Sequence, residues 1–182
     1  MWYYIILSLA GLINTANSIW VVEVNRLFKS CENPHKRGPY PLDLSKLQIY
    51  LSEDDKLIMN GEMQFVQDIV PPWGISIYTE KLNHGEWHST PYTKNALDLC
   101  IDMQARHEIW YTITKHLNKS TCPYRKGHTE RFDMVELGSF GFDDVLPDLV
   151  GDWRIYTDFR MGTVPHKAKL SCMMTELSIL EH

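Results

Sequence analysis

Four cysteines are the residues of this chain whose chemistry can be predicted most directly. Cys31, Cys100, Cys122 and Cys172 all follow an apolar N-terminal segment. Their even number predicts two disulfide bonds formed in an oxidising compartment. Four cysteines allow three different pairings, and the spacing of these residues does not choose among them.

The histidines and carboxylates do not form a recognisable catalytic or metal-binding motif. His84 and His88 have the spacing of metal ligands, but no neighbouring set of cysteines or carboxylates completes a zinc site. His107 and Glu108 lack the second histidine of a zincin helix, because position 111 is a tyrosine. We therefore expect no enzymatic activity, no cofactor and no bound metal. A hydrolase built from carboxylates that are distant in sequence is the weakest alternative.

One site of covalent modification is predicted. Asn118, Lys119 and Ser120 form an N-glycosylation sequon at the expected exit of a helix into a loop. Because a secreted chain passes through the glycosylation machinery, we expect a glycan on Asn118.

The first 18 residues have the features of a signal peptide. Residues 1–13 form an apolar run that is too short to cross a bilayer comfortably, and Ala16-Asn17-Ser18 supplies small residues for cleavage. A signal anchor is the less favoured alternative, because its apolar run would have to continue to Val22 across the polar residues 14–18. We expect a secreted, extracellular protein with a signal peptide at 1–18, one domain at 19–182 and no transmembrane segment.

The charge of the chain argues against a nucleic-acid partner. The formal net charge is −5, and residues 1–18 contain no Asp, Glu, Lys, Arg or His. An acidic domain does not neutralise phosphates, so neither nucleic acid nor an anionic lipid surface is favoured by charge.

Most of the chain alternates between apolar and polar residues, which predicts β-strands. Gly61 interrupts the apolar face of one strand, where a missing side chain predicts a bulge or a bend. The predicted strands span residues 20–27, 47–51, 57–65, 73–81, 86–90, 129–137, 153–159 and 167–180.

The pattern changes between Thr93 and Leu117, where apolar residues recur at spacings of three and four. This spacing predicts two short helices on a sheet. Strands with one helical insertion predict an all-β fold, a two-sheet antiparallel β-sandwich.

The order of several motifs resembles the insect secreted family related to the ganglioside GM2 activator, which includes the chemosensory protein B group. That family is similar to the ML (MD-2-related lipid-recognition) sandwich. Besides the leader and the early cysteine, the motifs are Gly61–Phe65, Leu97–Cys100, Cys122-Pro123 with Gly127 after it, and Leu146-Pro147 before Gly151–Tyr156.

The resemblance implies a cup-shaped β-sandwich whose interior holds an acyl chain or another apolar small molecule. It also implies a disulfide pairing, Cys31 with Cys172 and Cys100 with Cys122. The cavity between the two sheets of such a sandwich is apolar because the inward faces of the strands are apolar. We expect ligand contacts from inward faces of two strands, namely from Ile75, Ile77, Trp153, Ile155 and Phe159.

Two functions of different classes follow. The favoured one is a secreted, non-enzymatic carrier of a lipid or other apolar small molecule, such as a pheromone or a cuticular hydrocarbon in chemosensation. The alternative is a protein-interaction module or receptor accessory protein whose core is filled by side chains and whose surface binds a cell-surface receptor.

Overall fold

The chain folds into β-strands with two short α-helices. The computed structural model describes residues 20–31, 40–54, 56–137, 147–162 and 169–181, so the predicted signal peptide at 1–18 lies outside the described residues. The elements are β1 (Trp20–Ser30), β2 (Leu42–Leu51), β3 (Leu57–Phe65), β4 (Trp73–Asn83), β5 (Glu86–Ala96), α1 (Leu99–Asp102), α2 (Tyr111–Thr114), β6 (Thr129–Glu136), the 3-10 helix η2 (Pro147–Leu149), β7 (Gly151–Met161) and β8 (Lys169–Glu181).

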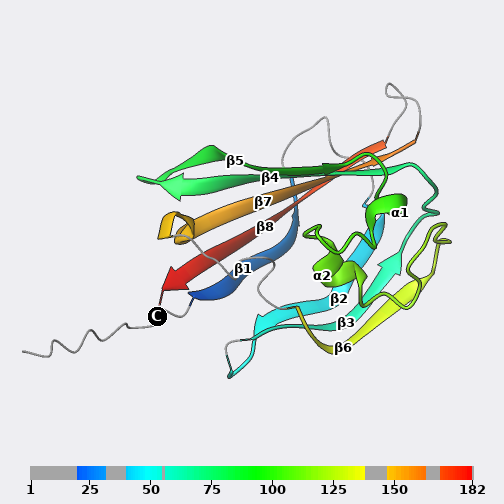
Figure 1. Cartoon of the computed structure of the whole chain (residues 1–182), viewed down its shortest axis with the longest axis horizontal. Coiled ribbons are helices and arrows are strands. Elements are labelled where there is room, and N and C mark those ends of the chain that lie inside the picture. Colours follow the sequence, from blue (N-terminus) through cyan, green and yellow to red (C-terminus); the bar gives the residue numbers. More distant parts are fainter. Residues whose placement is uncertain (1–19, 32–39, 55, 138–146, 163–168, 182) are drawn as a thin grey trace, which may run out of the picture.

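The strands form two antiparallel sheets that lie in two layers (Figure 1). The larger sheet has the order β1-β8-β7-β4-β5, and the smaller sheet has the order β2-β3-β6. Both helices lie toward one end of the molecule, between the levels of the two sheets (Figure 1). The predicted all-β sandwich with a short helical insertion is confirmed. No helix among the described residues is both long enough and apolar enough to cross a membrane.

The predicted helical segment begins later than the spacing of its residues suggests. We expected the segment between Thr93 and Leu117 to hold the helices, with the helical spacing beginning at Ala96, but β5 extends to Ala96, which pairs with Ile75 of β4. Sheet pairing along β4 therefore overrides the local helical spacing at this point. The helices themselves are confined to residues 99–102 and 111–114.

One large apolar core fills the space between the sheets. The inward residues of β3, Leu57, Met59, Met63 and Phe65, are buried in it. Phe65 also stacks on the buried Tyr124 with ring centroids 4.2 Å apart. The central strand of the smaller sheet is thus covered along its inward face.

The predicted irregularity at Gly61 is present. The pairing of β3 with β6 shifts register between Met59 and Gly61, and Gly61 has a φ of +115°. A Cβ atom at this position would lie 2.0 Å from the carbonyl oxygen of Lys46. Glycine is required here because it alone adopts this φ readily and leaves room for the β2 backbone.

Candidate functional site

A groove opens between β1 and β2, the edge strands of the two sheets that contact each other. Its volume is about 420 Å³, which is within the range of small-molecule sites. The residues that line it are Leu27, Phe28, Ser30, Tyr40, Leu42, Asp43, Leu44, Ser45 and Leu47.

The apolar wall of the groove comes from the alternation of β2. Leu42, Leu44 and Leu47 pack against the main core, and the pairing irregularity between Asp43 and Lys46 keeps them on one face. These leucines are only half-buried, whereas the inward residues of β3 are buried. Within the described part of the chain, the sandwich is therefore covered at β3 and open at its β1–β2 edge.

The opposite wall comes from an irregular stretch of β1. Its pairing with β8 is interrupted between Val24 and Arg26 and again between Arg26 and Lys29. Phe28 has a φ of 54°, a conformation that is rare for a bulky residue. Because of this bulge, the adjacent Leu27 and Phe28 both line the groove, although neighbours in a regular strand face opposite sides.

Tyr40 connects the groove with the core. Its ring meets Phe159 edge-on, with ring centroids 5.8 Å apart. Its hydroxyl is buried and has no hydrogen-bond partner among the described residues. Burial raises the pKa of Tyr40 well above that of an ordinary phenol, and the carboxylate of Asp158 adds to the increase.

The five residues expected to contact a ligand divide between two clusters. Ile75 and Phe159 are buried in the main core, and Ile77 packs against it. Trp153 is buried in a second cluster with Leu177 and Ile179, and Ile155 packs there.

That second cluster is covered in part by η2. The indole N–H of Trp153 donates to the carbonyl oxygen of Leu149 at 2.7 Å, and Lys81 Nζ lies 5.4 Å from the Trp153 ring centroid. None of the five expected residues lines the described groove, although Phe159 touches its Tyr40.

Sequence reasoning missed most of the groove residues for identifiable reasons. Leu42 and Leu44 alternate with Asp43 and Ser45, which is a short signal for this wall, but they are out of phase with Leu47, Ile49 and Leu51 because of the irregularity between Asp43 and Lys46. Leu27 and Phe28 had no signal in the sequence. A bulge places both side chains on the same side of β1, and a strict alternation of apolar and polar residues does not reveal a bulge.

The two disulfides join Cys31 to Cys172 and Cys100 to Cys122. This is the pairing that the family resemblance implies. The Cys31–Cys172 bridge links the end of β1 to β8, next to Ser30 in the groove. It therefore fixes the irregular end of β1 to β8 within the larger sheet.

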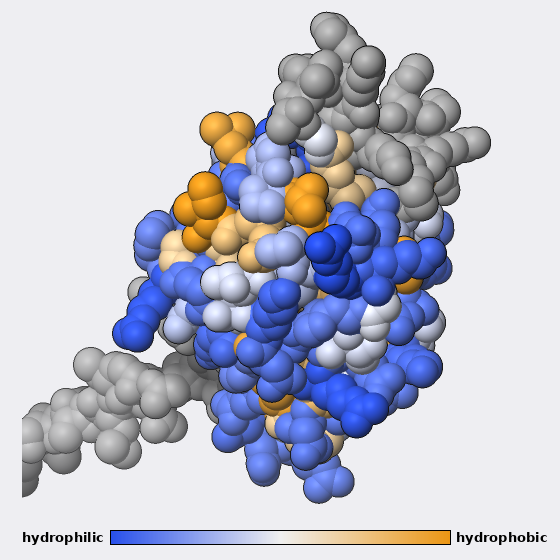
Figure 2. Space-filling view, turned by 90° about the vertical axis from the view of Figure 1, so that its right-hand side faces the viewer, coloured by the Kyte–Doolittle hydropathy of each residue, from blue (hydrophilic) through white to orange (hydrophobic). Residues whose placement is uncertain are grey.

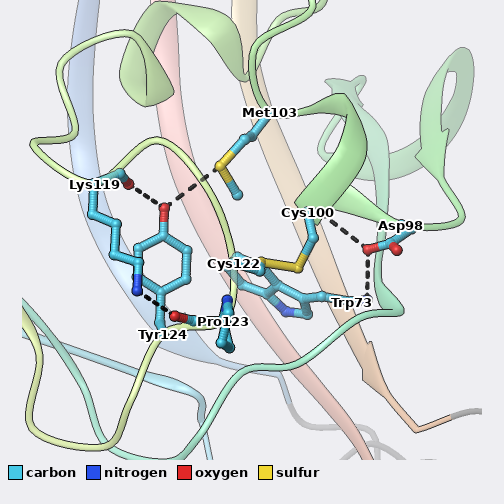
Figure 3. Close-up of a disulfide and its surroundings, with 8 residues drawn as sticks. All are labelled: Trp73, Asp98, Cys100, Met103, Lys119, Cys122, Pro123 and Tyr124. Atoms are coloured by element: carbon cyan, nitrogen blue, oxygen red, sulfur yellow. Dashed lines mark hydrogen bonds between the residues drawn. A yellow bond between two sulfur atoms is a disulfide. The ribbon is translucent and has the colours of Figure 1, made fainter.

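The second disulfide fastens the helical insertion over Trp73 (Figure 3). Asp98 caps α1 by accepting a hydrogen bond from the N–H of Cys100 at 3.0 Å, and it also accepts one from the N–H of Trp73 at 3.0 Å. The start of α1 is thereby tied to the start of β4.

Glu130 of β6 organises the segment that carries the glycosylation sequon. Its buried carboxylate accepts the N–H groups of Asn118 and Lys119 at 2.7 and 3.1 Å, and His128 Nε2 lies 2.6 Å from its Oε1. These contacts assign the carboxylate a structural role. Asn118 is exposed, and its glycosylation stays a prediction.

Exposed apolar side chains gather at the end of the molecule that carries α1. Leu97 is 79% exposed and Ile101 is 77% exposed, and Val70 lies exposed before β4. Figure 2 looks onto this end and shows apolar atoms on its surface. Leu97, Ile101 and Val70 are called the α1 patch below.

No group of three or more potential metal ligands comes together within the described part of the chain. The sequence matches no protein-family model and no curated protein.

Proposed function

We propose that this protein is a secreted, non-enzymatic binder of a lipid or another apolar small molecule, and that the groove between β1 and β2 is its binding site. The observation that carries the proposal is an apolar wall, formed by Leu42, Leu44 and Leu47, that the opposite sheet leaves half-covered.

Binding of a ligand that covers exposed apolar surface of this kind lowers the free energy. Burial of apolar surface is favourable by about 25 cal/mol per Å². A groove of about 420 Å³ suits a molecule of the size of a fatty acyl chain or a pheromone. The resemblance to the GM2 activator-like family supports the same class of ligand, including cuticular hydrocarbons.

Secretion is part of the same proposal. Two disulfides form in an oxidising compartment and not in a reducing cytosol. A secreted carrier needs no catalytic group, since its task is to enclose an apolar molecule in water.

Replacing a groove leucine tests the proposed site. Leu44→Asn places a polar amide in the groove wall, so we expect a fluorescent fatty-acid probe to bind about tenfold more weakly. Titration of the purified protein measures this. Ile49→Asn is the matched control, because Ile49 packs against the core from the same face of β2 but does not line the groove.

A second groove variant separates loss of binding from loss of folding. Ser30→Trp fills the groove from an exposed position of β1 and leaves the core side chains in place. We expect it to exclude the probe while circular dichroism remains unchanged. Full-strength probe binding by both Leu44→Asn and Ser30→Trp would show that the groove is not the site.

The α1 patch favours a second candidate function, a protein-interaction module or receptor accessory protein. Leu97 and Ile101 are apolar, almost fully exposed and close together in sequence, as in protein-binding surfaces. Leu97→Ser with Ile101→Ser should abolish receptor-dependent cell-surface binding under this function. Under the carrier function, the double variant keeps full probe affinity.

A further inference from the structure

Among the buried polar atoms without a hydrogen-bond partner in the described residues, three belong to residues that adjoin Phe159. They are the hydroxyl of Tyr40, the indole Nε1 of Trp73 and the hydroxyl of Ser171. Trp73 is 4% exposed and Ser171 is fully buried. Buried polar groups are nearly always paired, so three unpaired ones together require an explanation.

All three groups surround Phe159. The Trp73 ring stacks on Phe159 with centroids 5.6 Å apart, and the Tyr40 ring meets it edge-on at 5.8 Å. Ser171 of β8 is the register partner of Phe159 in β7, so both side chains lie on the same inward face. Tyr40 also lines the groove and so links these residues to the proposed binding site, whereas Trp73 and Ser171 are buried behind it and do not line the groove.

The donor and acceptor properties of these three groups indicate which type of ligand atom can pair with them. An indole N–H only donates hydrogen bonds, whereas each hydroxyl both donates and accepts. An oxygen that accepts hydrogen bonds satisfies all three groups. A hydrocarbon satisfies none of them.

We infer that the ligand is amphipathic, with an apolar chain in the β1–β2 groove and a neutral oxygen function, such as an alcohol, aldehyde, ketone or ester, that accepts hydrogen bonds from Tyr40, Trp73 and Ser171. This inference rests on the proposed function and names the ligand class for the same site. Because the three atoms are closed to solvent without ligand, binding in this way requires the Tyr40 ring to move and admit the oxygen.

A neutral oxygen fits this location better than a carboxylate. A buried anion needs a paired cation, and no lysine or arginine is among the buried residues of the described part of the chain. Burial raises the pKa of Tyr40 and the nearby carboxylate of Asp158 adds to the increase; both effects also oppose a second negative charge at this hydroxyl.

Three ligands of equal chain length test the inference: dodecanol, dodecane and dodecanoic acid. Competition with a fluorescent probe should rank dodecanol first, by about tenfold over dodecane, since hydrogen bonds to buried donors add to the apolar contact. Tyr40→Phe and Ser171→Ala remove one hydroxyl each. Each should weaken dodecanol severalfold and leave dodecane unchanged.

Tyr156→Phe is the control variant, because its hydroxyl donates to Glu80 at 2.9 Å and does not line the groove. It should leave the ranking unchanged. A second readout is the indole N–H resonance of Trp73, assigned by its loss in Trp73→Phe. Dodecanol should shift this resonance downfield, and dodecane should not.

The outcomes separate the inference from the function on which it rests. Equal binding of all three ligands, or a dodecanol preference that persists in both Tyr40→Phe and Ser171→Ala, overturns the neutral-oxygen inference. Neither result contradicts the proposal that the groove binds apolar ligands. Preference for dodecanoic acid also overturns it. If none of the ligands binds, the proposed function fails as well.

Discussion

Tyr124, which is buried, and Tyr40, which is partly buried, differ in what their hydroxyl groups contact. The hydroxyl of Tyr124 donates to the carbonyl oxygen of Lys119 and lies 3.5 Å from the sulfur of Met103 (Figure 3). The hydroxyl of Tyr40 is buried without a partner among the described residues. A buried hydroxyl that makes no hydrogen bond loses its hydration without compensation, so it destabilises the ligand-free fold.

Removing each hydroxyl tests this difference at the scale of a residue. Tyr124→Phe should lower the free energy of unfolding by about 1 kcal/mol, because it deletes a satisfied hydrogen bond. Tyr40→Phe should leave it unchanged or raise it. Urea unfolding without ligand measures both, and equal losses in the two variants would contradict the unpaired state of Tyr40.

At the scale of the element, bulges shape the smaller sheet and the groove. Gly61 lets β3 change register against β6 while the β2 backbone passes close by. The irregularity of β2 between Asp43 and Lys46 is opposite this position, since Lys46 pairs with Glu62. The apolar wall of the groove therefore depends on the local geometry around a glycine.

The Gly61 bulge can be tested with a matched pair of alanine variants. Gly61→Ala adds both an unfavourable φ and a contact with the Lys46 carbonyl oxygen, so it should destabilise the fold by about 3 kcal/mol or more. Gly85 also has a positive φ, +86°, but nothing lies within 4 Å of its added Cβ.

Gly85→Ala thus isolates the cost of φ, about 1 kcal/mol. Thermal unfolding measures both variants. Losses of equal size would show that the close approach of β2 does not contribute.

At the scale of the whole molecule, the disulfides hold different parts of the sandwich. The Cys31–Cys172 bridge spans 141 residues and connects β1 with the last strand, while Cys100–Cys122 spans 22 residues and encloses the helical insertion. Closing a longer loop removes more conformational freedom from the unfolded chain.

The two bridges should therefore differ in their effect on stability. Replacing Cys31 and Cys172 together with alanine should lower the free energy of unfolding by about 5 kcal/mol, against about 3 kcal/mol for Cys100 and Cys122. Denaturant unfolding of the two double variants measures the difference. The reverse order would mean that the helical insertion, and not the β1–β8 link, limits the stability of the fold.

Much of the fold could be predicted because it is encoded in short-range patterns. The alternation of β3 and of β7 marks their inward faces, and the change of spacing after Thr93 marks the helical insertion. The extent of β5 could not be predicted, because residues 93–96 are held in a strand by pairing with β4. Pairing with the preceding strand is not recorded in the local spacing of residues 93–96.

The sequence by itself determined the fold class and the apolar faces, because a period of two requires a covered side for each sheet. Only the tertiary structure decided which parts of these apolar faces are covered by the opposite sheet and where, within the described part of the chain, a groove is left open. Phe159 is inward by sequence, but its place among Tyr40, Trp73 and Ser171 depends on contacts between distant strands. The groove itself exists because two edge strands, β1 and β2, meet without pairing, and the alternation within a strand carries no record of its neighbours.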